Sequence, residues 1–185
     1  MKISSFSETI AEPYAEALLS LGEEQNILEA IGNDVSLILT SLASVDEWKR
    51  FLDTPLIKEE GKKQVLRQVF GGNVNPLTLN FLMLLVDRKR ISFLRQICRS
   101  FQKLLRAKYN IALAEVTTAV PLSESQQEQL RQKVQAMTQA SRVELALAIN
   151  PDLIGGVVFK VGSQVVDASV RGELRRLSNR LLASV

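Results

Sequence analysis

The sequence predicts an N-terminal all-α six-helix bundle over residues 1–106 and a smaller α+β C-terminal domain over residues 107–185. Two observations support this fold class. Apolar residues recur at helical spacing through about the first hundred positions, and beyond them strand-like alternation appears between helical segments. Only 5% of the residues are aromatic although 46% are hydrophobic, so Leu, Ile and Val supply the core, as is typical of packed helices.

Three helices are predicted in the first third of the chain. Pro13 suits the opening turn of the first, and the apolar residues that follow it recur at helical spacing. Gly22 marks the end of this helix, and a second apolar stripe runs through residues 27–42. A short third helix is predicted over residues 46–52. Pro55 stops it, because the residue before a proline is pushed out of the helical region.

Three further helices complete the predicted bundle. The fourth helix covers residues 58–70 and ends at Gly71 and Gly72. Its apolar side chains Val65, Leu66 and Val69 are expected to face inward. Asn75 and Pro76 form a cap and first-turn pair for the fifth, residues 77–86. This helix is apolar nearly all round, so we expect it to lie centrally. The sixth, residues 91–106, should turn its apolar side chains inward and its arginines outward.

The C-terminal part is predicted to combine strands and helices. Residues 111–120 form a strand candidate that is apolar or small on both faces. Ser123 and Gln126, three positions apart, form a capping box for a helix that runs to about residue 139. Alternating apolar residues then predict a half-buried strand over residues 143–149.

A hairpin and a last helix follow. Residues 156–161 and 164–167 flank Gly162 and Ser163, a two-residue loop with glycine where a positive φ is needed. The final helix, residues 169–182, is expected to pack its leucines inward and to present its arginines largely outward. The leucines are Leu174, Leu177 and Leu181, and the arginines are Arg171, Arg175, Arg176 and Arg180.

The composition leaves little room for catalysis. The chain has no histidine, which excludes His-based triads and His-ligated zinc, and its single cysteine excludes an internal disulfide and any multi-Cys metal site. That residue, Cys98, lies on the apolar face of the sixth helix, so we expect a buried and inert thiol. Gly155 and Gly156 enter a strand without a phosphate-loop motif. We therefore expect no enzyme activity, no cofactor and no metal.

Charge is distributed unevenly, although the net charge is only +3. Residues 1–48 hold one lysine against nine acidic residues, and residues 87–108 hold eight basic residues against Asp87. Two interpretations stay open: opposite faces of one bundle attract each other, or the basic helix binds a nucleic-acid backbone. The second lacks an aromatic stacking face. The basic residues are Arg88, Lys89, Arg90, Arg95, Arg99, Lys103, Arg106 and Lys108.

No membrane-spanning or targeting segment is predicted. The N-terminal residues lack the apolar core of a signal peptide. The longest internal apolar run, residues 81–86, is far shorter than the roughly 20 residues that span a bilayer. We expect any membrane contact of this chain to be indirect, through a partner.

Several segments together match one family in order and spacing. They are PYAEAL at residues 13–18, FLDTPLI at 51–57, NFLMLLVD at 80–87, NPDLIGG at 150–156 and VVDASVRGEL at 165–174. The whole pattern resembles the δ subunit of F-type ATP synthase, called the oligomycin-sensitivity-conferring protein in mitochondria, and points to its bacterial, cyanobacterial or chloroplast type. The resemblance extends over essentially the whole chain.

This resemblance implies a connector rather than an enzyme. In the family, the N-terminal domain grips N-terminal helices of the α subunits, and the C-terminal domain holds the b-type subunits of the peripheral stalk. The stator so formed keeps the catalytic head from turning, which couples proton-driven rotation to ATP synthesis. The resemblance further implies a peripheral membrane protein on the cytoplasmic or stromal side of an energy-coupling membrane, either thylakoid or plasma membrane.

The family's groove for the α-subunit helix lies between the first and fifth helices. Matched onto this chain, it nominates Tyr14, Ala17, Leu18, Leu79, Leu82, Met83 and Val86, with Ile31 as a rim residue. Plain burial in the bundle stays open as the alternative for each of them. The family-signature residues Gly155, Gly156, Asp167, Ser169 and Gly172 are expected to form the fold, with Asp167 capping backbone amides.

Overall fold

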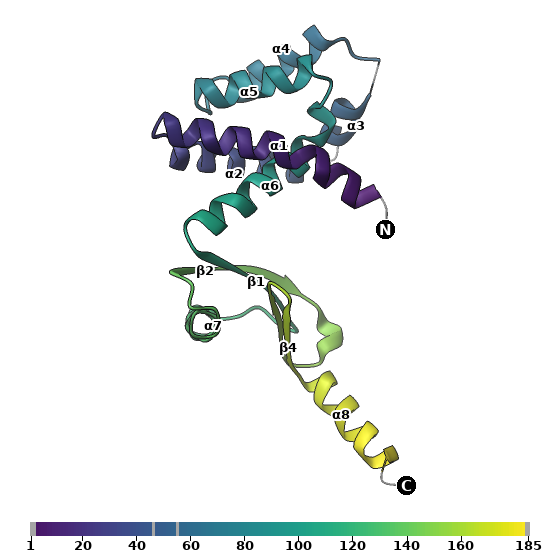
Figure 1. Ribbon diagram of the computed structural model, residues 1–185. Coiled ribbons are helices and arrows are strands. Elements are labelled where there is room, and N and C mark those ends of the chain that lie inside the picture. The colour runs from purple at the N-terminus through teal and green to yellow at the C-terminus, as the bar shows by residue number, and fades with distance from the viewer. Residues whose placement is uncertain (1–2, 46, 55, 184–185) are drawn as a thin grey trace. The chain divides into compact units, whose positions relative to one another are not determined.

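The computed structural model describes residues 3–45, 47–54 and 56–183, and it divides the chain into two compact units, Met1–Leu105 and Arg106–Val185 (Figure 1). The first unit is helical, and the second combines helices with a four-stranded sheet. The predicted order of a helical part followed by an α+β part is therefore confirmed. The predicted roles of Asp46 and Pro55 at the third helix lie outside the described residues.

The helices of the first unit lie where the sequence predicts them, with ends shifted by a few residues except at the start of the first helix. They are α1 (Ile3–Glu24), α2 (Leu28–Ser44), α3 (Glu47–Asp53), α4 (Glu59–Phe70), α5 (Pro76–Asp87) and α6 (Leu94–Lys108), with a 3-10 turn η1 (Ile91–Phe93) before α6. All of them contribute to one core, in which Phe70 and Phe101 are the largest buried side chains. Val69 of α4, predicted to face inward, is 40% exposed instead.

Helix α1 begins ten residues earlier than predicted, because Pro13 lies inside it instead of opening it. A proline in a helix interior lacks the N–H of one backbone hydrogen bond and usually bends or ends the helix. Here the Pro13 ring is exposed, whereas Ala11 and Ala15 on either side are fully buried. Continuing the helix through Pro13 buries both alanines, and this packing offsets the lost hydrogen bond.

The start of α5 is fixed by a buried carboxylate. The Asn75 side chain accepts a hydrogen bond from the Leu77 N–H at 3.0 Å, as expected of the Asn-Pro cap. Asp34 of α2, only 8% exposed, accepts from the Asn75 N–H at 2.9 Å and from the Thr78 hydroxyl at 2.6 Å. Because a buried carboxylate is costly without partners, these two bonds tie α2 to α5 in one arrangement.

Two basic side chains of the first unit serve the fold. The Lys62 ammonium donates to the Leu52 carbonyl in the last turn of α3 at 2.6 Å. Arg95 donates in the same way to the Leu42 carbonyl near the end of α2. The last carbonyls of a helix have no partner within it and carry partial negative charge, so each cation caps a helix C-terminus.

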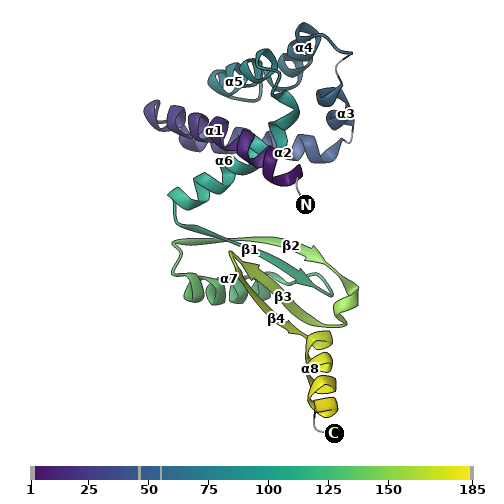
Figure 2. The same ribbon diagram turned by 45° about the vertical axis from the view of Figure 1, so that its right-hand side comes forward.

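The second unit is built on a mixed sheet. Its strands are β1 (Ile111–Thr118), β2 (Arg142–Ile149), β3 (Gly156–Val161) and β4 (Gln164–Ser169), in the order β2-β1-β3-β4. Strands β1 and β2 are parallel and are connected through α7 (Glu124–Thr138), whereas β3 is antiparallel to both β1 and β4 (Figure 2). Helix α7 packs Val134 against the sheet core around Val116 and Phe159.

The predicted half-buried strand over residues 143–149 forms, but two of its apolar side chains do not face the core: Leu147 is 47% and Ile149 57% exposed. The turn and cap signals in this unit are confirmed. Ser123 and Gln126 form the predicted capping box at the start of α7. The β3–β4 hairpin turns at Gly162, which has a φ of 58°. Asn150 caps a short 3-10 turn, η2 (Pro151–Leu153), by accepting from the Asp152 N–H at 3.0 Å. The last helix, α8 (Val170–Ala183), follows β4 directly.

Candidate functional site

The chain's single thiol, that of Cys98, is unreactive. Cys98 is 3% exposed in the core of the first unit, and burial raises the pKa of its thiol to about 12. Because only the thiolate is strongly nucleophilic, a thiol with this pKa is unreactive near neutral pH. This confirms the predicted role of Cys98. Among residues 3–45, 47–54 and 56–183, no three His, Cys, Asp or Glu side chains gather as a metal site would require.

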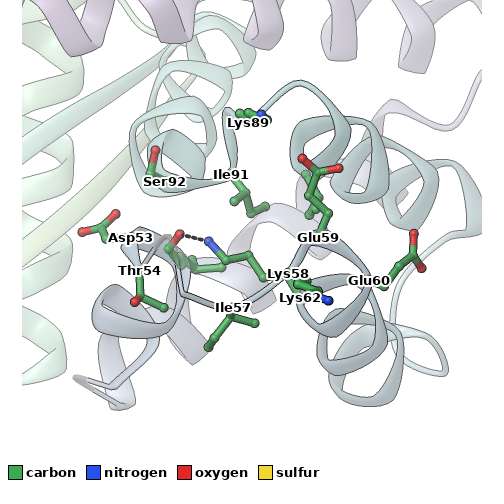
Figure 3. Close-up of a pocket in the computed structure, with 12 residues that line it drawn as sticks. Asp53, Thr54, Ile57, Lys58, Glu59, Glu60, Lys62, Lys89, Ile91 and Ser92 are labelled. Carbon is green, nitrogen blue, oxygen red and sulfur yellow. Dashed lines mark hydrogen bonds between the residues drawn. The ribbon is translucent and has the colours of Figure 1, made fainter.

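A cavity of about 610 Å³ lies in the first unit, between the end of α3, the start of α4 and η1 (Figure 3). Its walls hold three lysines and three carboxylates, so their charges balance. The buried cation, Lys62, is already bonded to the Leu52 carbonyl. This cavity therefore has no surplus of positive charge with which to hold a phosphate group. The charged residues are Asp53, Lys58, Glu59, Glu60, Lys62 and Lys89.

The structure separates the eight nominated partner-binding residues into two sets. Four belong to the hydrophobic core and are at most 2% exposed: Leu18, Ile31, Leu82 and Val86. For these four, the alternative of plain burial applies, and they offer no surface to a partner. The other four are accessible: Tyr14, Leu79 and Met83 are half-buried against the core, and Ala17 is exposed. Helical spacing identified an apolar helix correctly but could not say which side of it faces the core.

Helix α1 carries a second apolar stripe beside its buried one. Ala11, Ala15 and Leu18 face the core, whereas the half-buried Tyr14 and the exposed Ala17 lie along one flank. The same flank includes two half-buried residues that the nominated set lacked, Ile10 and Leu21. The four flank positions follow the i, i+4, i+7, i+11 spacing of one helix face. That spacing was present in the sequence and could have identified Ile10 and Leu21.

Helix α5 is apolar on more than its core side. Leu82 and Leu85 are fully buried, but Leu84 is 43% exposed, so the prediction that α5 lies centrally and is enclosed on all sides is wrong. Leu79 and Met83 lie between these extremes. A helix that is apolar beyond its buried face has surface left to bind another helix.

The prediction that the leucines of α8 pack inward is wrong. Leu174, Leu177 and Leu181 are 52%, 51% and 72% exposed. Figures 1 and 2 show α8 leaving the sheet at the end of β4 without folding back over it. The amphipathic pattern of this helix is real, but the pattern does not specify whether the chain itself or another molecule covers the apolar side.

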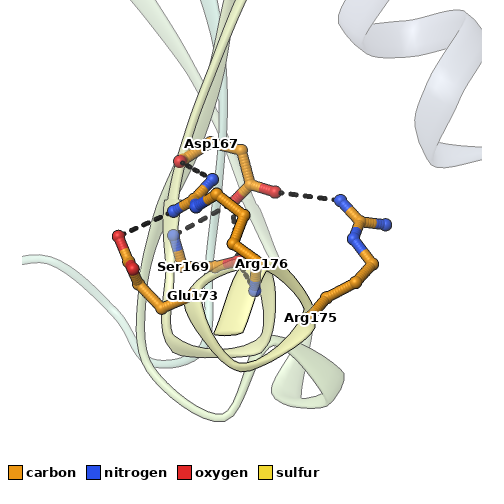
Figure 4. Close-up of polar contacts among 6 residues, drawn as sticks. Asp167, Ser169, Glu173, Arg175 and Arg176 are labelled. Atoms are coloured by element: carbon orange, nitrogen blue, oxygen red, sulfur yellow. Dashed lines mark hydrogen bonds and ion pairs between the residues drawn. The ribbon is translucent and has the colours of Figure 1, made fainter. Parts of the chain in front are cut away.

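The junction between β4 and α8 is held by a polar network around Asp167 (Figure 4). Its carboxylate accepts hydrogen bonds from the Ser169 N–H at 3.0 Å and from the Ser169 hydroxyl at 2.6 Å. The Ser169 oxygen accepts in turn from the Gly172 N–H at 3.0 Å. Arg176 donates to the Asp167 carbonyl at 3.3 Å, and Arg175 lies 3.7 Å from the carboxylate. These contacts confirm the predicted capping role of Asp167 and identify it as structural.

This network predicts a pH-dependent stability. The two hydrogen bonds from Ser169, with help from Arg176 and Arg175, lower the pKa of Asp167 below its usual value. The carboxylate therefore stabilises the fold above its unfolded pKa of about 3.9, and that contribution is lost as pH falls through the lower folded value. We expect Asp167→Asn to lower the urea midpoint at pH 7, and the deficit to shrink toward pH 3. Far-UV circular dichroism measures both midpoints.

The control for this prediction is the exposed Asp152, which lies in the same unit. Asp152→Asn should leave the urea midpoint nearly unchanged at both pH values. A deficit for Asp167→Asn that stays constant between pH 7 and pH 3 would contradict the role assigned to the ionised carboxylate.

The basic segment shows no sign of a nucleic-acid interface. Arg95 caps α2, and Arg106 lies 3.6 Å from the carboxylate of Glu144. The aromatic ring on the same helix, Phe101, is fully buried and cannot stack on a base. Arg95 and Arg106 therefore contribute to folding, and nothing favours the nucleic-acid alternative.

These features define a class of protein. The chain consists of two units, each with an apolar helix surface left accessible on α1 and α5 in one and on α8 in the other. Its only thiol is buried, and its buried charges serve hydrogen bonds within the fold. Accessible apolar helix faces of this kind are typical of the class of proteins that bind other protein chains.

Comparisons with known proteins give the family. The model of the family described as "ATP synthase delta (OSCP) subunit" matches residues 10–181. The chain belongs to this family. ATP synthase subunit delta of Synechococcus sp. (strain JA-2-3B'a(2-13)) is 50% identical over 178 residues, which are 96% of this chain and 98% of the relative. The Thermosynechococcus vestitus (strain NIES-2133 / IAM M-273 / BP-1) protein of that name is 53% identical over 169 residues, 91% of each chain.

A solved structure supports the same conclusion. One chain in the cryo-EM structure of the Toxoplasma gondii mitochondrial ATP synthase hexamer superposes with a TM-score of 0.76 at 27% sequence identity. The match covers 93% of this chain and 97% of that chain. In the part of the chain that the structure describes, every helix is too short or too polar to cross a bilayer.

Proposed function

We propose that this chain is the non-catalytic stator subunit that links the catalytic head of an F-type ATP synthase of the cyanobacterial type to its peripheral stalk. The observation that carries this function is the family match over residues 10–181, with cyanobacterial δ subunits about as long as this chain and 50% identical or close to it. In this role, the subunit keeps the head from turning with the rotor, so that proton-driven rotation is coupled to ATP synthesis.

In this proposal the two parts of the chain hold different partners. Residues 1–106, acting as a six-helix bundle, bind the N-terminal helices of α subunits, and residues 107–185 bind the b-type subunits of the stalk. Because both binding sites are on one chain, a partner that dissociates briefly stays at high effective concentration and rebinds. The link therefore resists torque even when one of the two contacts opens for a moment. The subunit is a peripheral component of the membrane-bound complex, and we place it on the cytoplasmic side of the thylakoid or plasma membrane.

The accessible apolar residues of α1 and α5 form the proposed surface for the α-subunit helix. From the nominated set these are Tyr14, Ala17, Leu79 and Met83, and the flank of α1 adds Ile10 and Leu21. An amphipathic helix binds such a surface by burying its own apolar side, as in other helix-in-groove complexes. The core packs behind this surface and holds its side chains in place. The nominated residues that belong to the core are Leu18, Ile31, Leu82 and Val86.

Calorimetric titration with a peptide of the cognate α-subunit N-terminus tests this surface. We expect tight binding with a negative heat-capacity change, the mark of buried apolar area. Ala17→Arg places a charged side chain at an exposed position of the apolar flank. It should weaken binding at least tenfold, or about 1.4 kcal/mol, without disturbing the core.

The matched control is Glu12→Arg, which introduces the same side chain at an exposed position on the side of α1 opposite the apolar flank. It should bind the peptide as the unsubstituted protein does. Equal weakening by both substitutions would remove the flank as the binding surface. No binding by well-folded unsubstituted protein would overturn the proposed contact with the α subunit.

A further inference from the structure

Helix α8 presents a stripe of four exposed apolar side chains. Val170, Leu174, Leu177 and Leu181 are 43%, 52%, 51% and 72% exposed. Their spacing of four, three and four residues is that of successive d, a, d and a positions of a heptad repeat. An apolar stripe this regular is costly to leave in water, and no described part of the chain covers it.

We infer that α8 is one half of a short heterotypic coiled coil, whose other half is an acidic amphipathic helix of the partner. This inference rests on the proposed attachment of the second unit to the stalk, and it specifies the residues and the chemistry of that contact. The four apolar side chains are hereafter called the heptad seam. They insert between the apolar side chains of the partner helix as knobs into holes.

The charge of α8 determines which kind of helix fits. The helix has four arginines and a single acidic residue, Glu173, whose carboxylate already lies 2.7 Å from Arg176. The e and g positions that border the heptad seam select the partner of a coiled coil. They hold Arg171 and Arg180 together with Ser178 and Glu173, whose carboxylate is the one already paired with Arg176. Glutamates at the facing positions of the partner are attracted, and basic residues there are repelled. Two copies of α8, each with four arginines and one glutamate, carry the same sign of net charge, so self-association is disfavoured.

The apolar surface continues beyond the first turn of α8. The Val170 N–H donates to the Gly155 carbonyl at 3.0 Å. Gly155 also lines a cavity of about 400 Å³ together with two side chains that are each 66% exposed, Val120 and Ile154. A Cβ on Gly155 would lie 3.2 Å from the Val170 side chain, so the heptad seam begins beside this second apolar patch.

The test uses the full chain and three probes of equal length. Two are designed helical peptides with leucine at every a and d position, one with glutamate and one with lysine at e and g. The third is the C-terminal segment of a cognate b-type stalk subunit. We expect the acidic peptide to bind at least tenfold more tightly than the basic one, with an advantage that falls as salt is raised. Leu177→Asp should weaken binding of the acidic peptide at least tenfold.

Asn179→Asp is the matched control, because it adds the same carboxylate on the side of α8 opposite the heptad seam and should change affinity less than twofold. Equal effects of the two substitutions, or equal affinity for the acidic and basic peptides, would overturn the inference. So would a concentration-dependent dimer of the free chain that Leu177→Asp abolishes, measured by light scattering.

The stalk segment separates this inference from the proposed function. If the segment binds the Leu177→Asp variant as tightly as the unsubstituted chain, the stalk attachment holds and the heptad seam is refuted. If the segment fails to bind while the acidic peptide binds in a Leu177-dependent way, the heptad seam holds and the stalk role is refuted.

Discussion

Replacing Leu82 with aspartate is expected to unfold the N-terminal unit instead of selectively weakening a partner contact. Leu82 is fully buried in the core of that unit, so the substitution removes an apolar side chain and places a carboxylate where it has no partner. Burial of an unpaired charge costs several kcal/mol, which is comparable to the whole stability of a domain, roughly 5–15 kcal/mol. Fluorescence of Trp48, the chain's only tryptophan, which stacks on the buried Phe70, reports the loss.

Leu84→Asp is the control for this result. Leu84 lies two residues further along α5 and is 43% exposed, so a carboxylate there stays in water. We expect a change in stability within about 1 kcal/mol, as is usual for surface positions. A Leu82→Asp variant that melts like the unsubstituted protein would contradict the core position of Leu82 and return it to the candidate binding surface.

Replacing Gly156 with alanine is expected to disrupt the pairing of β3 with β4. Gly156 has a φ of 76°, and a Cβ at this position would lie 2.2 Å from the Ala168 carbonyl oxygen on the neighbouring strand. Because the positive φ and the Ala168 carbonyl oxygen are both features of the backbone, no side chain can move to make room. The strands must therefore separate, at a cost of at least about 3 kcal/mol. Hydrogen exchange of the β3 and β4 amides, followed by mass spectrometry, measures the loss of protection.

Gly162 separates the two contributions to this cost. It also has a positive φ, 58°, but a Cβ there would meet nothing within 4 Å. Gly162→Ala should therefore cost only the conformational penalty of about 1–2 kcal/mol. Equal exchange in the two variants would show that the close approach of Gly156 to Ala168 is unimportant.

The structural role of Gly156 helps to explain why the family was recognisable from sequence. The most specific matching segment includes Gly156, Asp167, Ser169 and Gly172, and all four are structural. Gly156 permits a close strand pair, and the other three hold the start of α8, where a Cβ on Gly172 would lie 2.6 Å from the Asp167 carboxylate. The resemblance therefore identified the fold, and through it the family, by residues that lie outside both proposed binding surfaces.

Short-range interactions, which can be read from the amino-acid order, specify the local structure and the order of elements. The cap at Asn75, the capping box at Ser123 and the hairpin at Gly162 each depend on residues within about four positions, so short-range hydrogen bonding and allowed φ values suffice to predict them. The change from helical to strand spacing likewise separated the two parts of the chain. Pro13 is the exception, because burial of Ala11 and Ala15 outweighed its local preference.

Which apolar side chains are covered depends on packing between elements that are distant in sequence. Leu82 and Leu177 both lie on helices with apolar faces, yet one is fully buried and the other is 51% exposed. Periodicity gives the direction in which a side chain leaves its helix, but burial depends on whether another element, distant in sequence, packs there. For Leu82 the core of the first unit does so. For Leu177, no described element packs over the side chain, so we propose that a partner helix covers the stripe.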